Sequence, residues 1–291
     1  MTTIATALTH AQQQLLRADT DSARLDAEIL LSTVLDCDRS YLYTWPQKEL
    51  TSTQDDLFST KLQRRISGEP VAYITGKKEF WSLMLEVNAS TLIPRPETEL
   101  LIAVALRKFS DKETTNNFIE VLDLGTGTGA IALALAKEMP AWQILACDVK
   151  PEVVHLAQHN VRALGIHNVT CVASDWFSHI NNKTFDLIVS NPPYIDALDE
   201  HLLQGDVRFE PRTALVADKN GLADLERIIE QSIVYLKSAG WLMVEHGFTQ
   251  GAAVRALFDR FAYSAIETFT DLAGKDRVTI GKKSFGEQTH G

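Results

Sequence analysis

The sequence predicts an α/β protein built on a parallel sheet, with a smaller helical domain before it. Five apolar stretches alternate with three helical ones: strands are expected at 119–124, 142–148, 169–173, 185–190 and 240–246, and helices at 130–139, 151–165 and 222–237. Strands that are apolar throughout and separated by helices are typical of a sheet covered on both faces. With 291 residues, the chain is long enough for two domains.

The first part of the chain, residues 1–70, has the features of a small helical domain. Apolar residues recur at helical spacing after Asp21 or Ser22, either of which suits a helix N-cap. A further helix is expected to begin at Thr53 as its cap and to end at Gly68. We therefore assign 1–70 to an N-terminal helical domain.

A β-hairpin over residues 71–90 is expected to join this domain to a second one at 91–291. Apolar side chains alternate there with the period of a strand, at Trp81, Leu83, Leu85 and Val87. Gly76-Lys77 is the expected turn. A helix should begin near Glu97, and the chain should close with an antiparallel pair, "AYSAIETFT" and "DRVTIGKK", that turns near Gly274.

Composition excludes several classes of protein. The formal net charge of −10 argues against a broad surface that grips phosphates. Cys37, Cys147 and Cys171 are far apart and form no CxxC, so we expect reduced thiols and a cytoplasmic protein. The N-terminus lacks the pattern of a signal peptide, and no apolar run approaches the ~20 residues that span a bilayer.

A glycine-rich turn follows the first strand of the parallel sheet and opens a helix. Its residues, in "VLDLGTGTGAIALALA", are Gly125, Thr126, Gly127, Thr128 and Gly129. Glycines let the backbone approach a ligand, and the helix N-terminus offers free amides. The spacing is GxGxG rather than the GxGxxG of dinucleotide sites, and no basic residue lies in the loop. S-adenosyl-L-methionine therefore fits better, with Asp123 suited to its cationic tail; a tight turn without a ligand is the alternative.

Acidic residues at the ends of the next two strands favour the same nucleoside-like cofactor. Asp148 is placed to accept from both ribose hydroxyls, although it could instead cap the helix that starts near Pro151. Asp175 and Trp176 follow the next strand, where a carboxylate could accept from the adenine amino group and the indole could form an apolar wall. A helix cap beside a packed Trp is the alternative for this pair.

The motif Asn191-Pro192-Pro193-Tyr194 ends the fourth strand at the same edge of the sheet. Two prolines stop the strand and stiffen the backbone. The Asn191 side-chain oxygen and the Pro192 carbonyl can accept two N–H bonds from a planar amine, while Tyr194 stacks on it. These residue types suit methyl transfer to a conjugated nitrogen; a rigid surface turn is the alternative.

Two kinds of nitrogen remain open as the acceptor: an exocyclic amine of a DNA or RNA base, and a glutamine side-chain amide. Residues 1–90 carry 9 Lys and Arg against 12 Asp and Glu, and the remainder carries 19 against 26. Both parts are acidic, so neither offers an electrostatic footprint for a nucleic acid. The charge distribution favours a protein substrate over an adenine in DNA or RNA.

The order of motifs resembles the release factor glutamine methyltransferase family along nearly the whole chain. The motifs are "GEPVAYITGKKEFW", "LIPRPETE", "VLDLGTGTGAIALALA", "SDWF", "NPPYI" and "GDVRFEPRTALVA". This resemblance implies a Rossmann-like S-adenosylmethionine-dependent methyltransferase domain and, as substrate, the Gly-Gly-Gln glutamine of class 1 peptide chain release factors, methylated at N5. It implies cofactor binding by residues 125–129, Asp148, Trp176 and Asn191, and a substrate clamp at residues 191–194. It also implies that the helical domain docks the release factor.

Other candidate residues are weaker. His155 and His159 are spaced i, i+4 on a helix but have no third ligand nearby, so we expect no metal. A base at Glu245-His246 is speculative, and Arg95 could border the cofactor or form a salt bridge. We expect a monomer whose partner is a protein, with no stable nucleic-acid or membrane partner.

Overall fold

A computed structural model describes residues 2–109 and 118–284 of the chain, which divide into two compact units. The first unit contains Met1–Lys77 together with His201–Phe209, and the second contains the rest of the described chain. Each unit has its own hydrophobic core. No helix in the described ranges is long and apolar enough to cross a bilayer.

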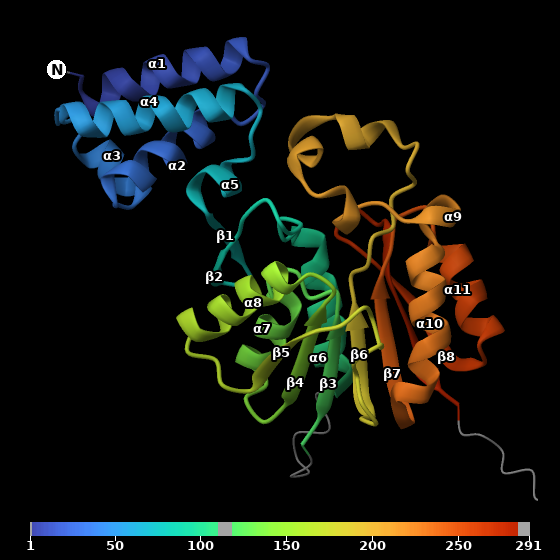
Figure 1. The fold of residues 1–291 in the computed structure, drawn as a ribbon. Helices are drawn as coiled ribbons and strands as arrows, with labels where there is room; N and C mark the ends of the chain where they lie inside the picture. Colours follow the sequence, from blue (N-terminus) through green and yellow to red (C-terminus); the bar gives the residue numbers. More distant parts are fainter. Residues whose placement is uncertain (1, 110–117, 285–291) are drawn as a thin grey trace, which may run out of the picture. The chain divides into compact units, whose positions relative to one another are not determined.

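The first unit is helical (Figure 1). Its helices are α1 (Ile4–Arg17), α2 (Ala23–Leu35), α3 (Arg39–Thr44), α4 (Ser52–Ile66) and α5 (Val71–Thr75). Ser22, one of the two predicted caps, is the N-cap of α2, although its hydroxyl donates to Asp26 at 2.8 Å and makes no capping bond to the backbone. Helix α4 begins earlier than expected, because Thr51 rather than Thr53 forms a capping box with Gln54.

The predicted hairpin is shorter than 71–90. Helix α5 replaces its first half, and the two strands are β1 (Lys77–Phe80) and β2 (Leu83–Glu86). Pro70 begins α5 and Gly76, at φ 74°, ends it, so the two residues frame a helical turn. The hairpin turns instead at Trp81 and Ser82, which both have a positive φ. The prediction of a turn at Gly76-Lys77 was therefore wrong.

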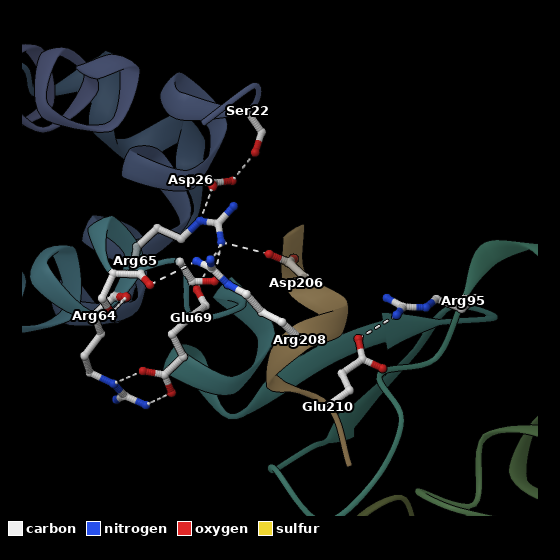
Figure 2. A network of polar contacts seen from close by, with 11 residues as sticks. Ser22, Asp26, Arg64, Arg65, Glu69, Arg95, Asp206, Arg208 and Glu210 are labelled. Carbon is white, nitrogen blue, oxygen red and sulfur yellow. Dashed lines mark hydrogen bonds and ion pairs between the residues drawn. The ribbon is translucent and has the colours of Figure 1, made fainter. Parts of the chain in front are cut away.

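The first unit also contains a segment from much later in the chain, with the short 3₁₀ turns η3 (Glu200–Leu203) and η4 (Gly205–Phe209). Arg65 of α4 donates to Asp26 at 2.6 Å and to Asp206 at 2.9 Å (Figure 2). Arg208 donates to the Ser67 carbonyl at 3.2 Å. The division at 1–70 did not anticipate this segment, because nothing in its local pattern indicates a partner 141 residues away.

The second unit is built on a seven-stranded sheet. Its strands are β3 (Glu120–Leu124), β4 (Gln143–Asp148), β5 (Val169–Ala173), β6 (Phe185–Ser190), β7 (Leu236–Glu245), β8 (Tyr263–Thr270) and β9 (Asp276–Lys283), in the order β5-β4-β3-β6-β7-β9-β8. The first five strands in this order run parallel, and β9 pairs antiparallel with both β7 and β8. The predicted parallel sheet and closing antiparallel pair are confirmed.

Helices cover both faces of this sheet, as Figure 1 shows. They are α6 (Glu99–Phe109), preceded by the 3₁₀ turn η1 (Pro96–Thr98), α7 (Ala130–Glu138), α8 (Pro151–Ala163), α10 (Ala223–Tyr235) and α11 (Gly251–Arg260). The short segment α9 (Asp218–Gly221) precedes α10 and contains two residues with left-handed backbone angles. On β3, Val121 packs with α6, α7 and α8, whereas its neighbour Leu122 packs with α10 and α11. Because β3, β4, β5 and β6 are parallel, their carboxyl ends meet at one edge of the sheet.

Candidate active site

A cavity of about 310 Å³ lies at the carboxyl ends of the parallel strands. Loops that follow four strands contribute to it, which matches the usual position of ligands in open α/β sheets. The predicted site residues that line it are Gly125, Thr126, Gly127, Thr128, Asp148, Asp175, Trp176, Asn191 and Pro193. Its volume is within the range of small-molecule sites.

The glycine loop is held tightly at the base of this cavity. The Thr126 amide donates to the Cys147 carbonyl at 2.9 Å, which ties the loop to β4. Gly125 has a φ of 71°, and a Cβ there would lie 3.3 Å from the Trp176 ring. Gly129 is the N-cap of α7 and is not among the residues that line the cavity. Glycine at position 125 therefore serves both backbone conformation and close packing.

Asp123 does not reach the cavity, contrary to the role that we expected for it. The side chain is fully buried, and Thr126 donates to its Oδ2 at 2.6 Å. Burial raises the pKa of this carboxyl to about 7. The side chain holds Thr126 of the glycine loop and is not among the residues that line the cavity, so it is not placed to meet a cationic tail.

Asp148 lies at the end of β4 and lines the cavity. Its Oδ2 accepts from the Gly127 amide at 3.1 Å, and its Oδ1 accepts from the Lys150 amide at 3.3 Å. Burial raises its pKa, while these backbone donors lower it. Each carboxylate oxygen has a second lone pair, so the side chain can still accept from two hydroxyls of a ligand.

Trp176 lines the cavity in a left-handed conformation at φ 49°. Burial raises the pKa of Asp224, near the start of α10, and the Trp176 side chain lowers it. The neighbouring Asp175 is engaged by Arg227, whose two terminal nitrogens lie 3.0 and 3.2 Å from its oxygens. Asp175 therefore forms an ion pair instead of presenting a free carboxylate. Asp224 and Arg227 also line the cavity, and sequence reasoning missed both because α10 is far along the chain.

The Asn-Pro-Pro-Tyr segment meets the cavity through Asn191 and Pro193. The Asn191 Nδ2 donates to Thr98 Oγ1 at 3.1 Å. Pro192 and Tyr194 are not among the lining residues; the Tyr194 hydroxyl instead donates to Glu245 Oε1 at 3.2 Å. The predicted substrate clamp of residues 191–194 remains a prediction.

The pair Glu245-His246 ends β7. Burial raises the pKa of Glu245 to about 7 and lowers the pKa of His246. His246 is fully buried, and its Nε2 lies 2.8 Å from Thr279 Oγ1. Neither side chain lines the cavity, so the speculative base at this position has no support.

Arg95 borders the cavity and also forms a salt bridge, which combines the two roles that the sequence left open. Its Nη2 lies 2.5 Å from Oε1 of Glu210, whose side chain is completely buried (Figure 2). Thr98, three residues later, was also missed, although it lies in the quoted segment "LIPRPETE". In residues 2–109 and 118–284, no group of three potential metal ligands occurs.

Comparisons with known proteins agree with this architecture. Residues 6–76 match the model of the PrmC N-terminal domain, and residues 100–206 match the methyltransferase small domain. The chain is 49% identical over 271 residues to the release factor glutamine methyltransferase of Aliivibrio fischeri, covering 93% of this chain and 94% of that protein. It is 52% identical over 264 residues to the protein of that name from Salmonella typhimurium, covering 91% and 94%.

A solved structure shows the same fold at much lower identity. It is the 16S rRNA N2 G1207 methyltransferase of Thermus thermophilus in complex with AdoMet and guanosine, with a TM-score of 0.51 and 16% identity. The match covers 71% of this chain and 49% of that one. This likeness shows the fold alone.

Proposed function

We infer that this chain, which belongs to the release factor glutamine methyltransferase family, methylates the side-chain amide of a release factor glutamine. The observation that carries this function is the position of Asn191 in a cavity that also contains the glycine loop and Asp148. The Asn191 oxygen, which can accept a hydrogen bond from a substrate amide, and the loop proposed to bind the nucleoside thus share one cavity. Methyl transfer to a planar nitrogen requires that they lie together.

S-adenosyl-L-methionine fits the residues of this cavity. Asp148 offers carboxylate oxygens suited to ribose hydroxyls, and Trp176 offers an apolar wall. No lysine or arginine lies within residues 123–129 to neutralise a pyrophosphate. When bound, this cofactor supplies an electrophilic methyl group on a sulfonium. We propose residues 125–128, Asp148, Trp176 and Asn191 as the groups that hold it.

The role that we propose for Asn191 follows from the chemistry of the acceptor. An amide nitrogen is planar and a poor nucleophile, so the enzyme must orient it and favour the charge that develops on it. The Asn191 oxygen and the Pro192 carbonyl can each accept one of its two N–H bonds. Alignment then supplies most of the rate, with effective molarities of ~10⁵–10⁸ M for well-oriented groups. The product can lose its extra proton afterwards, so no strong base is required.

We propose a class 1 peptide chain release factor as the substrate and its Gly-Gly-Gln glutamine as the acceptor, modified at N5. The helical unit is the proposed docking surface; its match to the PrmC N-terminal domain over residues 6–76 supports this assignment. The monomeric state and the cytoplasmic location remain predictions.

Incubation with methyl-labelled cofactor tests the function. We expect label on a purified release factor, and none on the same factor with the glutamine of Gly-Gly-Gln changed to alanine. Equal label on both proteins would exclude the proposed acceptor. Label that enters added DNA or RNA, and that survives protease treatment of the substrate, would instead support an adenine methyltransferase.

A further inference from the structure

The side chains behind Asn191 form a connected group that no step of the proposed function has used. Thr98, in η1, accepts from Asn191 Nδ2 at 3.1 Å. Glu245, at the end of β7, accepts from the Tyr194 hydroxyl at 3.2 Å. Two residues that are distant in sequence thus contact both ends of the Asn-Pro-Pro-Tyr motif.

The direction of these hydrogen bonds decides which atom of Asn191 faces the cavity. The oxygen and nitrogen of an Asn amide have nearly the same shape, so a flip of the amide exchanges an acceptor for a donor. Only the oxygen can accept an N–H from a glutamine amide. Because Asn191 Nδ2 is bonded to Thr98, the oxygen Oδ1 is left for a ligand in the cavity that Asn191 lines.

A threonine hydroxyl can either donate or accept. In this structure the Thr98 oxygen accepts from Asn191, so the nitrogen of the Asn191 amide is the atom that faces Thr98. Both Thr98 and Glu245 are well shielded, at 4% and 1% exposed. Bulk water therefore competes little for the bonds that they form with Asn191 and Tyr194.

The same carboxylate holds the far end of the motif. The Tyr194 hydroxyl bonds to Glu245, and the Tyr194 carbonyl accepts from Gln250 Nε2 at 3.0 Å. A Cβ at Gly221 would lie 2.0 Å from that carbonyl oxygen, so only glycine permits the approach. The backbone that carries Asn191 is thus fixed close to the side-chain network.

We propose that Thr98 and Glu245 are positioning residues for methyl transfer. Thr98 holds the Asn191 amide with its oxygen toward the cavity and its nitrogen away from it, and Glu245 holds Tyr194 at the other end of the motif. This inference rests on the proposed function, since it assigns the orientation that the amide acceptor requires. It adds to the Asn-Pro-Pro-Tyr motif two residues that determine which hydrogen bonds the motif can offer.

Variants at Thr98 separate positioning from a structural role. Thr98→Val keeps the shape of the side chain but removes the hydroxyl, so we expect kcat to fall about 10-fold or more, with KM for the release factor and Kd for the cofactor changed less than about 3-fold. Thr98→Ser retains the hydroxyl and should recover most of the lost kcat. Thr170→Val, on the exposed side of β5, is the matched control for loss of a hydroxyl.

A double variant gives the sharper readout. If Thr98 acts through Asn191, then Thr98→Val should change kcat less than about 2-fold in an Asn191→Ala background. The proposal would be overturned if Thr98→Val still lowered kcat about 10-fold in that background, or if the single variant left kcat unchanged. Should Thr98→Val fail to fold, Thr98→Ala in the same two backgrounds gives the same comparison.

A spectroscopic measurement keeps this result distinct from the proposed function. The ¹⁵N-labelled side-chain amide of Asn191, identified by its loss in Asn191→Ala, should shift in Thr98→Val and return in Thr98→Ser. This signal requires no substrate. Wild-type protein that transfers no methyl but shows the shift would refute the proposed function alone; an unshifted signal would refute the positioning role alone.

Discussion

At the scale of single residues, Asn191 is proposed to act mainly in the transition state and to contribute less to cofactor binding. Asn191→Ala should lower kcat by about 100-fold, because the variant loses an acceptor for the charge that develops on the nitrogen. Cofactor affinity, measured by calorimetry, should remain mostly intact. A variant that changes only KM would contradict this role.

Glu245 makes the folding stability depend on pH in a defined direction. Its folded pKa of about 7 lies above the ordinary value of 4.5, because burial outweighs the lowering effects of Thr98, Tyr194 and the Arg277 charge. Below pH 4.5 the carboxyl is neutral in both states. Between pH 4.5 and 7 the unfolded state loses the proton first, so stability falls as pH rises; above pH 7 the penalty is constant.

Glu245→Gln should remove this dependence. The free energy of unfolding of the variant, relative to wild type, should rise between pH 5 and pH 7.5 by up to about 3 kcal/mol. Urea unfolding at a series of pH values measures it. A difference that stays flat across this range would mean that the carboxyl does not change its proton binding on folding.

The sequence predicted several residues that line the cavity, but it did not predict the side chains to which they bond. Asp148, Trp176 and Asn191 were predicted because each follows a strand of the parallel sheet. The prediction for Asp123 was wrong, since position next to the glycine loop does not reveal that its side chain points into the core. The bond between Asp175 and Arg227 joins residues 52 apart, which no local pattern indicates.

At the scale of elements, the glycine loop is the part that the sequence specified most fully, and its packing can be tested. Gly125→Ala adds a Cβ 3.3 Å from the Trp176 ring and strains a residue at φ 71°. We expect cofactor affinity to fall about tenfold, equivalent to ~1.4 kcal/mol. Binding calorimetry measures the change.

A matched control separates packing from backbone strain. Gly274 has a φ of 74°, and a Cβ there would have no atom within 4 Å. Gly274→Ala should therefore lower the free energy of unfolding by ~1–2 kcal/mol through backbone strain. Cofactor affinity should be unchanged. Equal losses of affinity in the two variants would show that the contact with Trp176 is unimportant.

The parallel strands and their helices were predicted correctly because each is long and periodic. The short elements before the sheet were not predicted correctly. Helix α5 is flanked by a proline and a glycine, Pro70 and Gly76, which serve as its N-cap and C-cap. The same glycine also suits a hairpin turn, so local rules could not choose between the two outcomes.

At the scale of the whole molecule, the first unit is completed by residues 201–209. The structure places Arg65 between Asp26 and Asp206, with the Arg65 and Asp26 side chains 11% and 6% exposed. The charge pattern of either segment alone gives no sign of this pairing. The order of elements along the sequence predicted a helical unit followed by an α/β unit. It did not predict that residues 201–209 belong to the helical unit.

Arg65→Met tests the contribution of this ion pair. Loss of the guanidinium leaves Asp26 buried with Ser22 but without its positive partner, which should destabilise the helical unit by about 3 kcal/mol. Amide hydrogen exchange should accelerate in α2 and leave β3 unchanged. Arg64→Met is the control, because Arg64 is 43% exposed beside Glu69 and its loss should have little effect. Equal acceleration in both variants would contradict the assignment.

The central claim is that the Asn191 oxygen presents a glutamine amide to the methyl donor. The most direct measurement is mass spectrometry of a release factor after incubation with the enzyme and S-adenosyl-L-methionine, with the modified atom located by fragmentation. We expect wild-type enzyme to add one methyl group, on the side-chain nitrogen of the Gly-Gly-Gln glutamine. The Asn191→Ala variant should add very little. A methyl group on any other residue, or equal modification by both enzymes, would contradict it.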